Sequence, residues 1–475
     1  MELSIRTTGG ADSVLDGSLV EEFGAKLRGE LLRPGGGGYE EARRVWNGMI
    51  ERRPALIVRA AGVADVISSV NFARENGLLL AVRGGGHNVA GTALADGALV
   101  VDLSAMKGIR VDPEARTVRA EGGVTIGELD HETQKFALAA PMGLVSETGI
   151  AGLTLGGGLG WMRRKHGLSS DNLVSVDLVT ADGRFLTASE TGNADLFWGV
   201  RGGGGNFGVI ISFEYRLHPV GPEVMFCFVL YPGDRAREVL RFCEEYTASA
   251  PGEVSPIGVL GRVPRAEMFP ENWHGHPFAA VLAMYIGEAD EGERALRPLR
   301  ELGDPIADLS GPMSYTEAQQ VLDEDYPEGK RYYWKSQNLR GLADEEIERL
   351  IAHAQSAPSD ESTIDVWYQG GAMSRVGPTE TAFGDRSAPV LIGVEANWEE
   401  ARDDAANVAW ARECVEDLGR FSGGGSYLNF PGFLEEGDQQ LRDAFGGNYE
   451  RLAALKREYD PTNLFRVNQN IKPAT

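Results

Sequence analysis

Three glycine-rich runs, each preceded by a strand-like apolar segment, constrain the fold of this chain most strongly. They lie at Gly84–Gly86, Gly156–Gly160 and Gly202–Gly205. The chain has 62 glycines in 475 residues, about 13% against a usual ~7%, and they follow no G-X-Y repeat. Clustered glycines let the backbone approach a ligand closely and point successive N–H groups at it. The three runs therefore predict a large ligand that carries phosphate groups.

The standard phosphate-binding motifs do not account for these runs. No Gly-Lys-Ser/Thr sequence follows any of them, which argues against a P-loop. Gly156–Gly160 continues into Trp161-Met162-Arg163-Arg164, a poor match to the fingerprint of nicotinamide-dependent enzymes, so that class is the least favoured. The chain also lacks a nucleophile elbow and an H-E-x-x-H pair.

The composition excludes several classes of partner. The chain has 46 Lys and Arg against 70 Asp and Glu, a formal net charge of −24, so we expect neither nucleic acid nor an anionic membrane to bind it. Cys227, Cys243 and Cys414 form no C-x-x-C pair, and we expect no disulfide framework and no metal site. No apolar run approaches a membrane span, and no signal-peptide pattern is present. We therefore expect a cytoplasmic enzyme.

The apolar pattern becomes regular from Pro54 onward. Apolar residues between Val63 and Val70 recur at helical spacing. Strand-like runs flank this helix, and a glycine loop follows the second of them; the strands are predicted at Ala55–Ala60, Leu78–Val82 and Ala98–Leu103. Further on, Ala181-Asp182-Gly183 predicts the turn of a hairpin.

The pattern changes character after residue 220. Strand-like runs alternate there with charged amphipathic helices. Strands are predicted at residues 224–230, 278–286, 364–369 and 390–398, and helices at 235–248, 289–302, 343–355 and 400–417. This alternation predicts an α+β arrangement in which helices cover one face of a largely antiparallel sheet, leaving the other face free to cover a site.

Five segments, in order along the chain, resemble one family of enzymes. They are Val82–His87, Val100–Ser104, Gly149–Gly160, Asp195–Gly208 and a C-terminal stretch from Asn448 to Ile471 that contains Tyr459-Asp460-Pro461-Thr462-Asn463. Together they are similar to the berberine bridge enzyme-like branch of the vanillyl-alcohol-oxidase flavoproteins.

The resemblance implies a two-part FAD-binding domain of the PCMH type with an inserted substrate domain. The FAD domain takes residues 1–220 and is completed by a C-terminal tail, residues 431–475. The substrate domain takes residues 221–430, and its sheet covers the isoalloxazine ring. Members of the family pass a hydride from a substrate C–H to flavin N5, and oxygen usually reoxidises the flavin to give hydrogen peroxide.

The resemblance also assigns the FAD contacts. His87 is expected to bind the flavin covalently through an 8α-N-histidyl bond. Many members add a second, cysteinyl bond, but Val145 occupies that position here, so we expect one bond only, as in the singly linked members. The expected contacts are Arg83, Gly84, Gly85, Gly86, His87, Asn88, Val145, Thr148, Gly149, Gly152, Gly157, Gly158, Gly160, Val209 and Asn468.

The identity of the catalytic base is open. Several members use the last tyrosine of a Tyr-x-Asn-Tyr motif, but here Phe430 takes its place, and a phenyl ring cannot accept a proton. The remaining candidates on the chain are Tyr368, Gln369, Tyr427 and Asn429. Strand alternation allows only one of Tyr368 and Gln369 to face the ring. Glu395 is a further candidate, although we expect it to pair with an arginine.

The leading prediction of function is an oxidase of a small alcohol, sugar or secondary metabolite, with molecular oxygen as the second partner. Three alternatives keep the flavin. In the first, the enzyme is a dehydrogenase that uses an electron acceptor other than oxygen. In the second, it oxidises an amine, a reaction that needs no strong base. In the third, the protein binds flavin without turnover.

Overall fold

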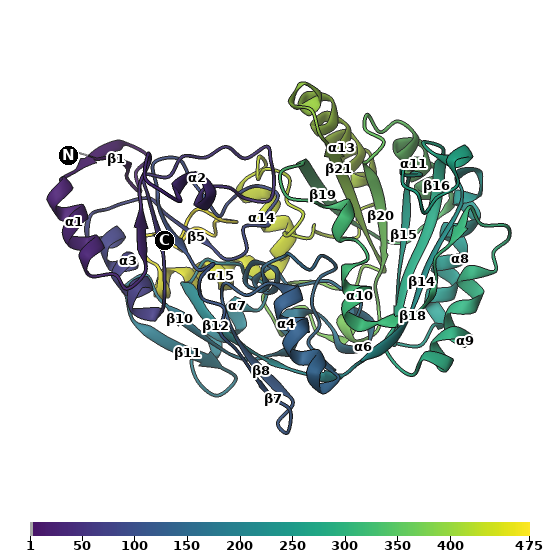
Figure 1. The fold of residues 1–475 in the computed structure, drawn as a ribbon, viewed down its shortest axis with the longest axis horizontal. Helices are drawn as coiled ribbons and strands as arrows, with labels where there is room; N and C mark the ends of the chain where they lie inside the picture. The colour runs from purple at the N-terminus through teal and green to yellow at the C-terminus, as the bar shows by residue number, and fades with distance from the viewer. Residues whose placement is uncertain (1–2) are drawn as a thin grey trace.

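The computed structural model describes residues 3–475. The chain forms two lobes side by side, and both termini lie in the same one (Figure 1). A short hairpin and helix open the chain: β1 (Leu3–Arg6), β2 (Asp12–Leu15) and α1 (Gly17–Ala25). Among the described residues, no helix is long and apolar enough to cross a bilayer.

The first lobe contains a four-stranded sheet in the order β3-β4-β6-β5, with β4, β6 and β5 parallel. The central strand β6 is fully buried, as expected for a parallel strand covered on both faces, whereas β4 and β5 end in partly exposed residues and the edge strand β3 is more exposed. Helix α3 (Val63–Glu75) makes the connection between β4 and β5 and buries Val66 and Val70. The strands are β3 (Glu30–Leu32), β4 (Leu56–Arg59), β5 (Leu80–Arg83) and β6 (Leu99–Asp102), which confirms the predicted start.

A second sheet in this lobe is antiparallel, in the order β11-β10-β12-β8-β7. The predicted hairpin is present as β10 and β11, with Leu178 opposite Leu186. The buried faces of these strands share one core with α7 (Ala194–Val200) and the C-terminal helices. The strands are β7 (Ile109–Asp112), β8 (Thr117–Glu121), β10 (Leu173–Val179), β11 (Phe185–Ser189) and β12 (Val209–Arg216).

The second lobe is built on one large antiparallel sheet, in the order β17-β14-β16-β15-β20-β21-β19, with β18 beside β14. The strands are β14 (Glu223–Pro232), β15 (Val254–Arg262), β16 (Pro277–Tyr285), β17 (Ala307–Asp308), β18 (Gly311–Ser314), β19 (Arg331–Leu339), β20 (Thr363–Tyr368) and β21 (Val390–Trp398). The predicted α+β class is confirmed. The sequence reading missed β15, which contains Pro256 and two glycines, and β19.

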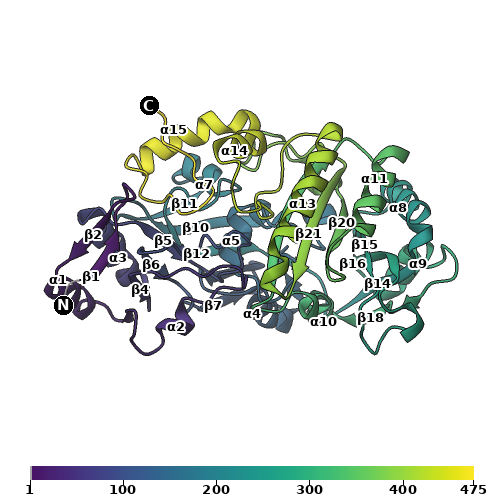
Figure 2. The same ribbon diagram turned by 90° about the horizontal axis from the view of Figure 1, so that it is seen from above.

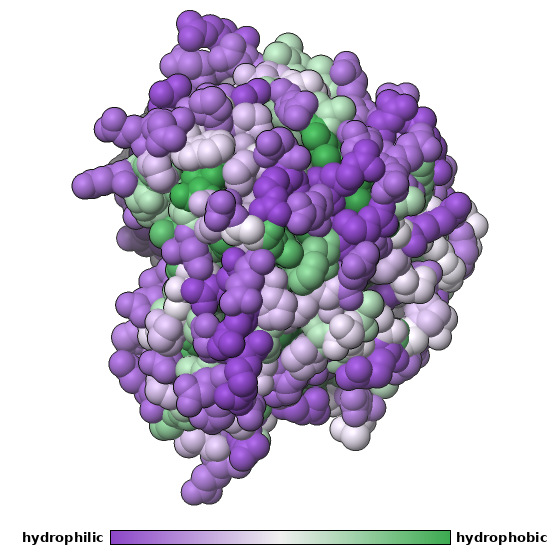
Figure 3. Space-filling view, turned by 90° about the vertical axis from the view of Figure 1, so that its right-hand side faces the viewer, coloured by the Kyte–Doolittle hydropathy of each residue, from purple (hydrophilic) through white to green (hydrophobic). Residues whose placement is uncertain are grey.

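Four helices cover the outer face of this sheet (Figures 1 and 2). They are α8 (Ala236–Ser249), α9 (Ala289–Arg300), α11 (Asp344–Gln355) and α13 (Asp404–Leu418), each close to its predicted range. Their solvent side is mostly hydrophilic with small apolar spots (Figure 3), as expected for amphipathic helices. The inner face of β19, β20 and β21 is left for the first lobe.

The C-terminal segment lies on the first lobe (Figure 2). Helix α14 (Asp438–Phe445) leads into α15 (Tyr449–Tyr459), which packs on α7. The Lys456 ammonium lies 2.8 Å from Asp460, and both side chains are fully buried. Lys456 also donates to the carbonyls of Asn206 and Phe465, while Asp460 accepts from the backbone N–H of Leu464. This ion pair fixes the last residues against the glycine loop that contains Gly202–Gly205.

We expect Lys456→Met to lower the free energy of unfolding by about 3–5 kcal/mol, because it leaves the Asp460 carboxylate buried without its cation. Urea denaturation followed by circular dichroism measures this. Lys472→Met is the matched control, because Lys472 pairs with Asp438 at the surface, where an ion pair contributes about 0–1 kcal/mol. Equal effects of the two substitutions would contradict the assignment.

Candidate active site

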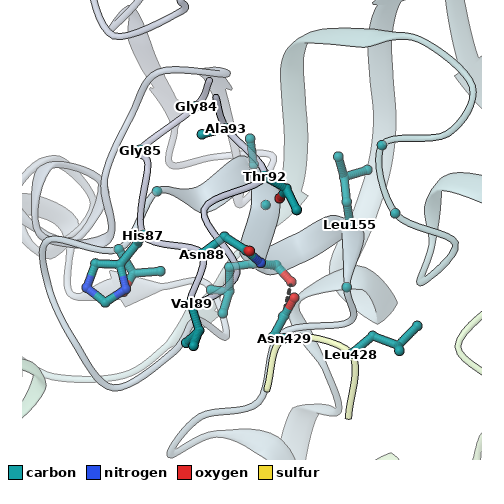
Figure 4. Close-up of a pocket in the computed structure, with 18 of the residues that line it drawn as sticks. Gly84, Gly85, His87, Asn88, Val89, Thr92, Ala93, Leu155, Leu428 and Asn429 are labelled. Atoms are coloured by element: carbon teal, nitrogen blue, oxygen red, sulfur yellow. Dashed lines mark hydrogen bonds between the residues drawn. The ribbon is translucent and has the colours of Figure 1, made fainter. Parts of the chain in front are cut away.

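A cavity of about 260 Å³ lies between the two lobes. The first lobe contributes its three glycine-rich loops, and the second contributes the inner face of β19, β20 and β21. Figure 4 shows the loop that carries His87 and Asn88 on one side, with Leu428 and Asn429 on the other. Residues from the N-terminal and the C-terminal parts of the chain therefore line the same cavity.

The first glycine loop touches, backbone to backbone, the loop that ends at Gly149. A Cβ on Gly85 would lie 2.5 Å from the Cα of Gly149, which is closer than atoms can pack. Gly86 has φ +73°, a conformation that glycine adopts without strain. Both loops line the cavity here through Gly84, Gly85, Gly86, Thr148 and Gly149. The glycines at this point are thus required by the protein's own packing as well as by access to the cavity.

His87 stands at the end of the first loop and lines the cavity. Its imidazole stacks on the ring of Trp46, with centroids 4.1 Å apart and planes at 17°. Burial lowers the pKa of His87 to about 3, so the ring is neutral at physiological pH. Its Nε2 is buried without a hydrogen-bond partner. A neutral, oriented imidazole is the form that can act as a nucleophile or bind a group covalently.

Trp46 and Asn47 join the two lobes, and the sequence reading missed both. Trp46 also stacks on Tyr332 of β19 at 3.7 Å, and its Nε1 donates to the carbonyl of Tyr326 at 2.8 Å. The Asn47 amide donates to the carbonyls of Val89 and Tyr332. The segment before Pro54 is therefore part of the site's frame. A tryptophan in an otherwise polar stretch was the only sequence signal for this role.

Part of the second glycine run does not reach the cavity. Gly157, Gly158 and Gly160 were predicted as cofactor contacts, but a Cβ on each would collide with Phe383, Ser169 and the Met142 carbonyl. Their lack of a side chain serves packing inside the protein. Arg83 and Val209 also lie outside the lining: Arg83 donates to the Ala42 carbonyl, and Val209 is in the core. The other predicted contacts, including Asn88, Val145, Gly152 and Asn468, line the cavity.

The assignment of Tyr368 as a catalytic residue is wrong. Its hydroxyl donates to the Leu240 carbonyl at 2.9 Å on the helix-covered face of the sheet. Strand alternation places its neighbour Trp367 on the cavity face instead. Gln369 lies beyond the end of β20, where it donates to Asn338 and lines a second cavity. Neither residue reaches the main cavity.

Tyr427 and Asn429 do line the main cavity, but they are held by the second glycine loop. The Tyr427 hydroxyl accepts from Leu159 N–H at 3.2 Å and from the Asn429 amide at 2.8 Å. The same amide donates to the Leu153 carbonyl. Burial raises the pKa of Tyr427, which makes its phenolate a poor candidate for a base. The two residues fix the loop at the cavity wall.

Two carboxyl groups face the cavity from the sheet. One is Glu395, the further candidate from the sequence, and the other is Asp365, which the sequence analysis did not single out. Asp365 of β20 is 6% exposed and Glu395 of β21 is 2% exposed. The expected arginine partner of Glu395 is absent: Oε2 accepts from the Tyr326 hydroxyl at 2.7 Å. Burial raises the pKa of both carboxyls, and the charge of Asp365 raises that of Glu395 further. Perturbed carboxyls in a cavity are typical of functional sites.

The registers of the strands explain why these groups meet. Glu395 lies directly opposite Thr363, and Asp365 lies directly opposite Gly393, so the carboxyls form a diagonal pair on one face. A Cβ at Gly393 would be 3.5 Å from Glu395 and 3.6 Å from both Asp365 and Phe430. Because Gly393 has no side chain, the space between the two carboxyl groups on this face of the sheet stays open. Phe430, in place of the expected tyrosine, closes the cavity with a ring and no hydroxyl.

Known proteins match nearly the whole length of the chain. The profile of an FAD-binding domain matches residues 54–189, and that of berberine and berberine-like proteins matches residues 426–472. An FAD-linked oxidoreductase of Dictyostelium discoideum is 32% identical over 462 residues, which span 96% of this chain and 97% of the relative. The chain belongs to the berberine bridge enzyme-like family of FAD-linked oxidoreductases.

Solved structures agree with this family. The crystal structure of 6-hydroxy-D-nicotine oxidase from Arthrobacter nicotinovorans superimposes with a TM-score of 0.84 at 30% identity, covering 94% of this chain and 98% of that one. A chitooligosaccharide oxidase shares the fold at 23% identity, with a TM-score of 0.83 and 96% and 100% coverage. The protein is therefore an FAD-binding enzyme with the PCMH-type architecture.

The residues of the cavity fit FAD. Gly152 and Gly205 line it, and a Cβ on either would meet no protein atom within 4 Å, so their backbone is open to a ligand. The side-chain amide oxygen Oδ1 of Asn468 and His87 Nε2 are buried without hydrogen-bond partners. Backbone amides open to a cavity and unpaired polar atoms on its wall are what a large nucleotide cofactor requires. When bound, FAD supplies a two-electron acceptor for a hydride.

Two glycine substitutions separate protein packing from cofactor contact. Gly85→Ala forces a methyl group into the Gly149 backbone, and we expect the flavin-free protein to lose about 1–3 kcal/mol of stability. Gly152→Ala meets no protein atom, and alanine favours its helix α5 (Ile150–Leu155). We expect this variant to keep the stability of the flavin-free protein and to bind less FAD.

Protein from riboflavin-starved cells provides the thermal melts, and the ratio of absorbance at the flavin band to that of protein gives the FAD content. A destabilised Gly152→Ala protein, or one with full FAD content, would contradict the view that Gly152 faces the cofactor.

Proposed function

We propose that the protein is an FAD-dependent oxidase that removes a hydride from a small-molecule C–H next to a hydroxyl or amino group, with molecular oxygen as the final acceptor. The carboxyl pair Asp365 and Glu395, on the sheet face opposite the flavin-binding loops, carries this proposal. Alcohol substrates, including sugars and secondary metabolites, must release an O–H proton as the hydride leaves, and a positioned base supports this.

Asp365 is the proton acceptor in this proposal. Its Oδ1 is buried without a partner, and it faces the cavity where substrate binds. Burial raises its pKa to about 7, which is near the value that suits a general base at physiological pH. Glu395 accepts a hydrogen bond from the Tyr326 hydroxyl, and burial together with the charge of Asp365 raises its pKa. Phe430 and the neighbouring tryptophans exclude water from the acids.

His87 is the covalent anchor in this proposal. Its ring is held by Trp46, it is neutral, and its Nε2 is free. Val145 lines the cavity at the position where a second, cysteinyl bond forms in other family members, and the three cysteines are buried away from the lining of this cavity. We therefore propose a single covalent bond between the protein and FAD, through His87.

We expect FAD to stay with the polypeptide after acid precipitation, and to remain on the denatured band as fluorescence in a gel. His87→Ala should retain FAD in the native state, because the loops still hold it, and release it on denaturation. Yellow supernatant from the unmodified protein would refute the covalent bond and leave the oxidase proposal standing.

We expect Asp365→Asn to lower the rate of anaerobic flavin reduction by about 10²–10⁴-fold with an alcohol substrate. The base must be ionised to accept a proton, so the reduction rate of the unmodified enzyme should rise with pH through about 7, the pKa of Asp365, and the variant should lose this rise. Tyr368→Phe, on the opposite face of the same strand, should keep both the rate and the pH profile.

Peroxide release in air distinguishes an oxidase from a dehydrogenase. If a substrate bleaches the flavin without oxygen but yields no peroxide in air, the protein is a dehydrogenase and not an oxidase. Failure of a broad panel to reduce the flavin at all would refute the proposed function.

A further inference from the structure

The charged side chains of the cavity are all of one sign. Among the residues that line it, Asp365 and Glu395 are the only acids, and there is no lysine or arginine. His87 contributes no charge, because burial holds its pKa at about 3. A ligand with a positive charge therefore meets two acceptors and no repelling group.

Aromatic rings surround these acids. Trp334 meets Tyr326 edge to face with centroids 5.2 Å apart, and it meets Phe430 in the same way at 5.3 Å. Trp367 lies on the other side of Phe430 at 6.4 Å. All four rings line the cavity. Ring faces attract cations, and an aromatic enclosure is the usual protein site for a substituted ammonium group.

Two polar atoms in this enclosure lack partners. Asp365 Oδ1 and Trp367 Nε1 are both buried without a hydrogen bond, and the two residues stand two positions apart on the same face of β20. Leaving such groups unpaired costs free energy, so each is expected to find a partner on the substrate. Asp365 Oδ1 can thus accept a hydrogen bond from a charged donor on the substrate. Trp367 Nε1, the next side chain on this face, can donate one to an acceptor on the substrate.

We propose that the substrate is a small aromatic or heterocyclic amine, bound as its ammonium form between Asp365 and Glu395, with a hydrogen-bond acceptor near Trp367 Nε1. This assignment rests on the proposed function and narrows it. A sugar has a hydroxyl on nearly every carbon, and this largely apolar wall provides few partners for them.

The surroundings of the acids favour a cation. Asp365 faces Thr363 on its own strand and Glu395 on β21, and the exposed Asp325, with Lys330 beside it, lies next to the pair. Burial is the main cause of the raised pKa values. The charge of Asp325 raises both pKa values further, and the charge of Asp365 also raises that of Glu395. A cation between the acids relieves both effects. Its binding should therefore release protons and strengthen as pH rises.

The reaction balances with these groups. The ammonium N–H proton passes to the Asp365 carboxylate, and the neutral amine then loses a hydride from its α-carbon to the bound flavin. The substrate becomes an iminium ion, which water converts to a carbonyl compound and a free amine. In the oxidase, oxygen takes the two electrons with the hydride's proton and one proton from solvent and becomes hydrogen peroxide, while Asp365 returns its proton to solvent.

The test uses the FAD-loaded protein and two probes that cannot be oxidised at an α-carbon. Benzamidine is a cation, and benzamide is its neutral counterpart of nearly the same shape. We expect benzamidine to bind at least about tenfold more tightly by calorimetry at pH 8, because it makes a charge-assisted bond. Its affinity should rise between about pH 6 and pH 8 as Asp365 ionises, with release of protons to the buffer.

Matched variants assign the preference. Asp365→Asn and, separately, Glu395→Gln should reduce the preference for benzamidine to near unity, whereas Tyr368→Phe should retain it. Trp367→Phe should preserve the preference for the cation. It should lower the affinity for benzamide, because the benzamide carbonyl loses the Trp367 Nε1 donor. Flavin content and circular dichroism of each variant show whether it is folded.

The outcomes separate this inference from the proposed function. Equal or tighter binding of benzamide, or fast reduction of the flavin by benzyl alcohol with none by benzylamine, would overturn the amine assignment and leave an oxidase. A strong preference for benzamidine in a protein whose flavin no substrate reduces would retain the amine site and refute the oxidase.

Discussion

The contact of Trp46 with both His87 and Tyr332 holds the site together. One ring face stacks on the histidine of the first glycine loop, and Tyr332 of the large sheet stacks on the same indole. Neighbouring backbone bonds reinforce the junction: Trp46 N–H donates to Gly86, and Gly48 N–H donates to Lys330. The distance between the flavin-binding loops and the carboxyl-bearing strands is set at this junction. A shift there would move the bound flavin relative to Asp365 and Glu395.

The acids are costly where they stand. A carboxylate in an apolar enclosure loses the hydration it has in water, and burial against rings offers no replacement. The sheet accommodates this by keeping the groups protonated over part of the physiological range and by giving Glu395 one tyrosine hydroxyl. Stability alone would favour leucine or methionine at these positions. The presence of Asp365 and Glu395 is explained when a substrate brings a proton or a positive charge to them.

Local pattern predicted much of the fold, because helices α3, α8 and α11 and the parallel strands follow simple periodicities. Side-chain direction was not predictable in the same way. Alternation divides Tyr368 from Trp367 but does not say which faces the cavity, since both are large and aromatic. Likewise Gly152 and Gly158 belong to the same segment, Gly149–Gly160, and only the neighbouring residues decide that Gly152 faces the cavity while Gly158 packs against Ser169. Trp46 contacts a carbonyl 280 residues away, and no local rule reaches that far.

The buried Lys456–Asp460 pair has a consequence for the order of folding. The core of the first lobe takes Leu452, Leu455 and Ile471 from the last part of the chain, so the first strand residue of this core, Val118, completes its packing only with residues up to about 350 positions later. The large sheet between them draws its strands from one continuous stretch. Closing such a long loop is slow. During synthesis the second lobe can therefore be complete while the flavin-binding lobe still exposes apolar surface, and the cofactor meets a finished cavity only after the last turn of α15 has docked.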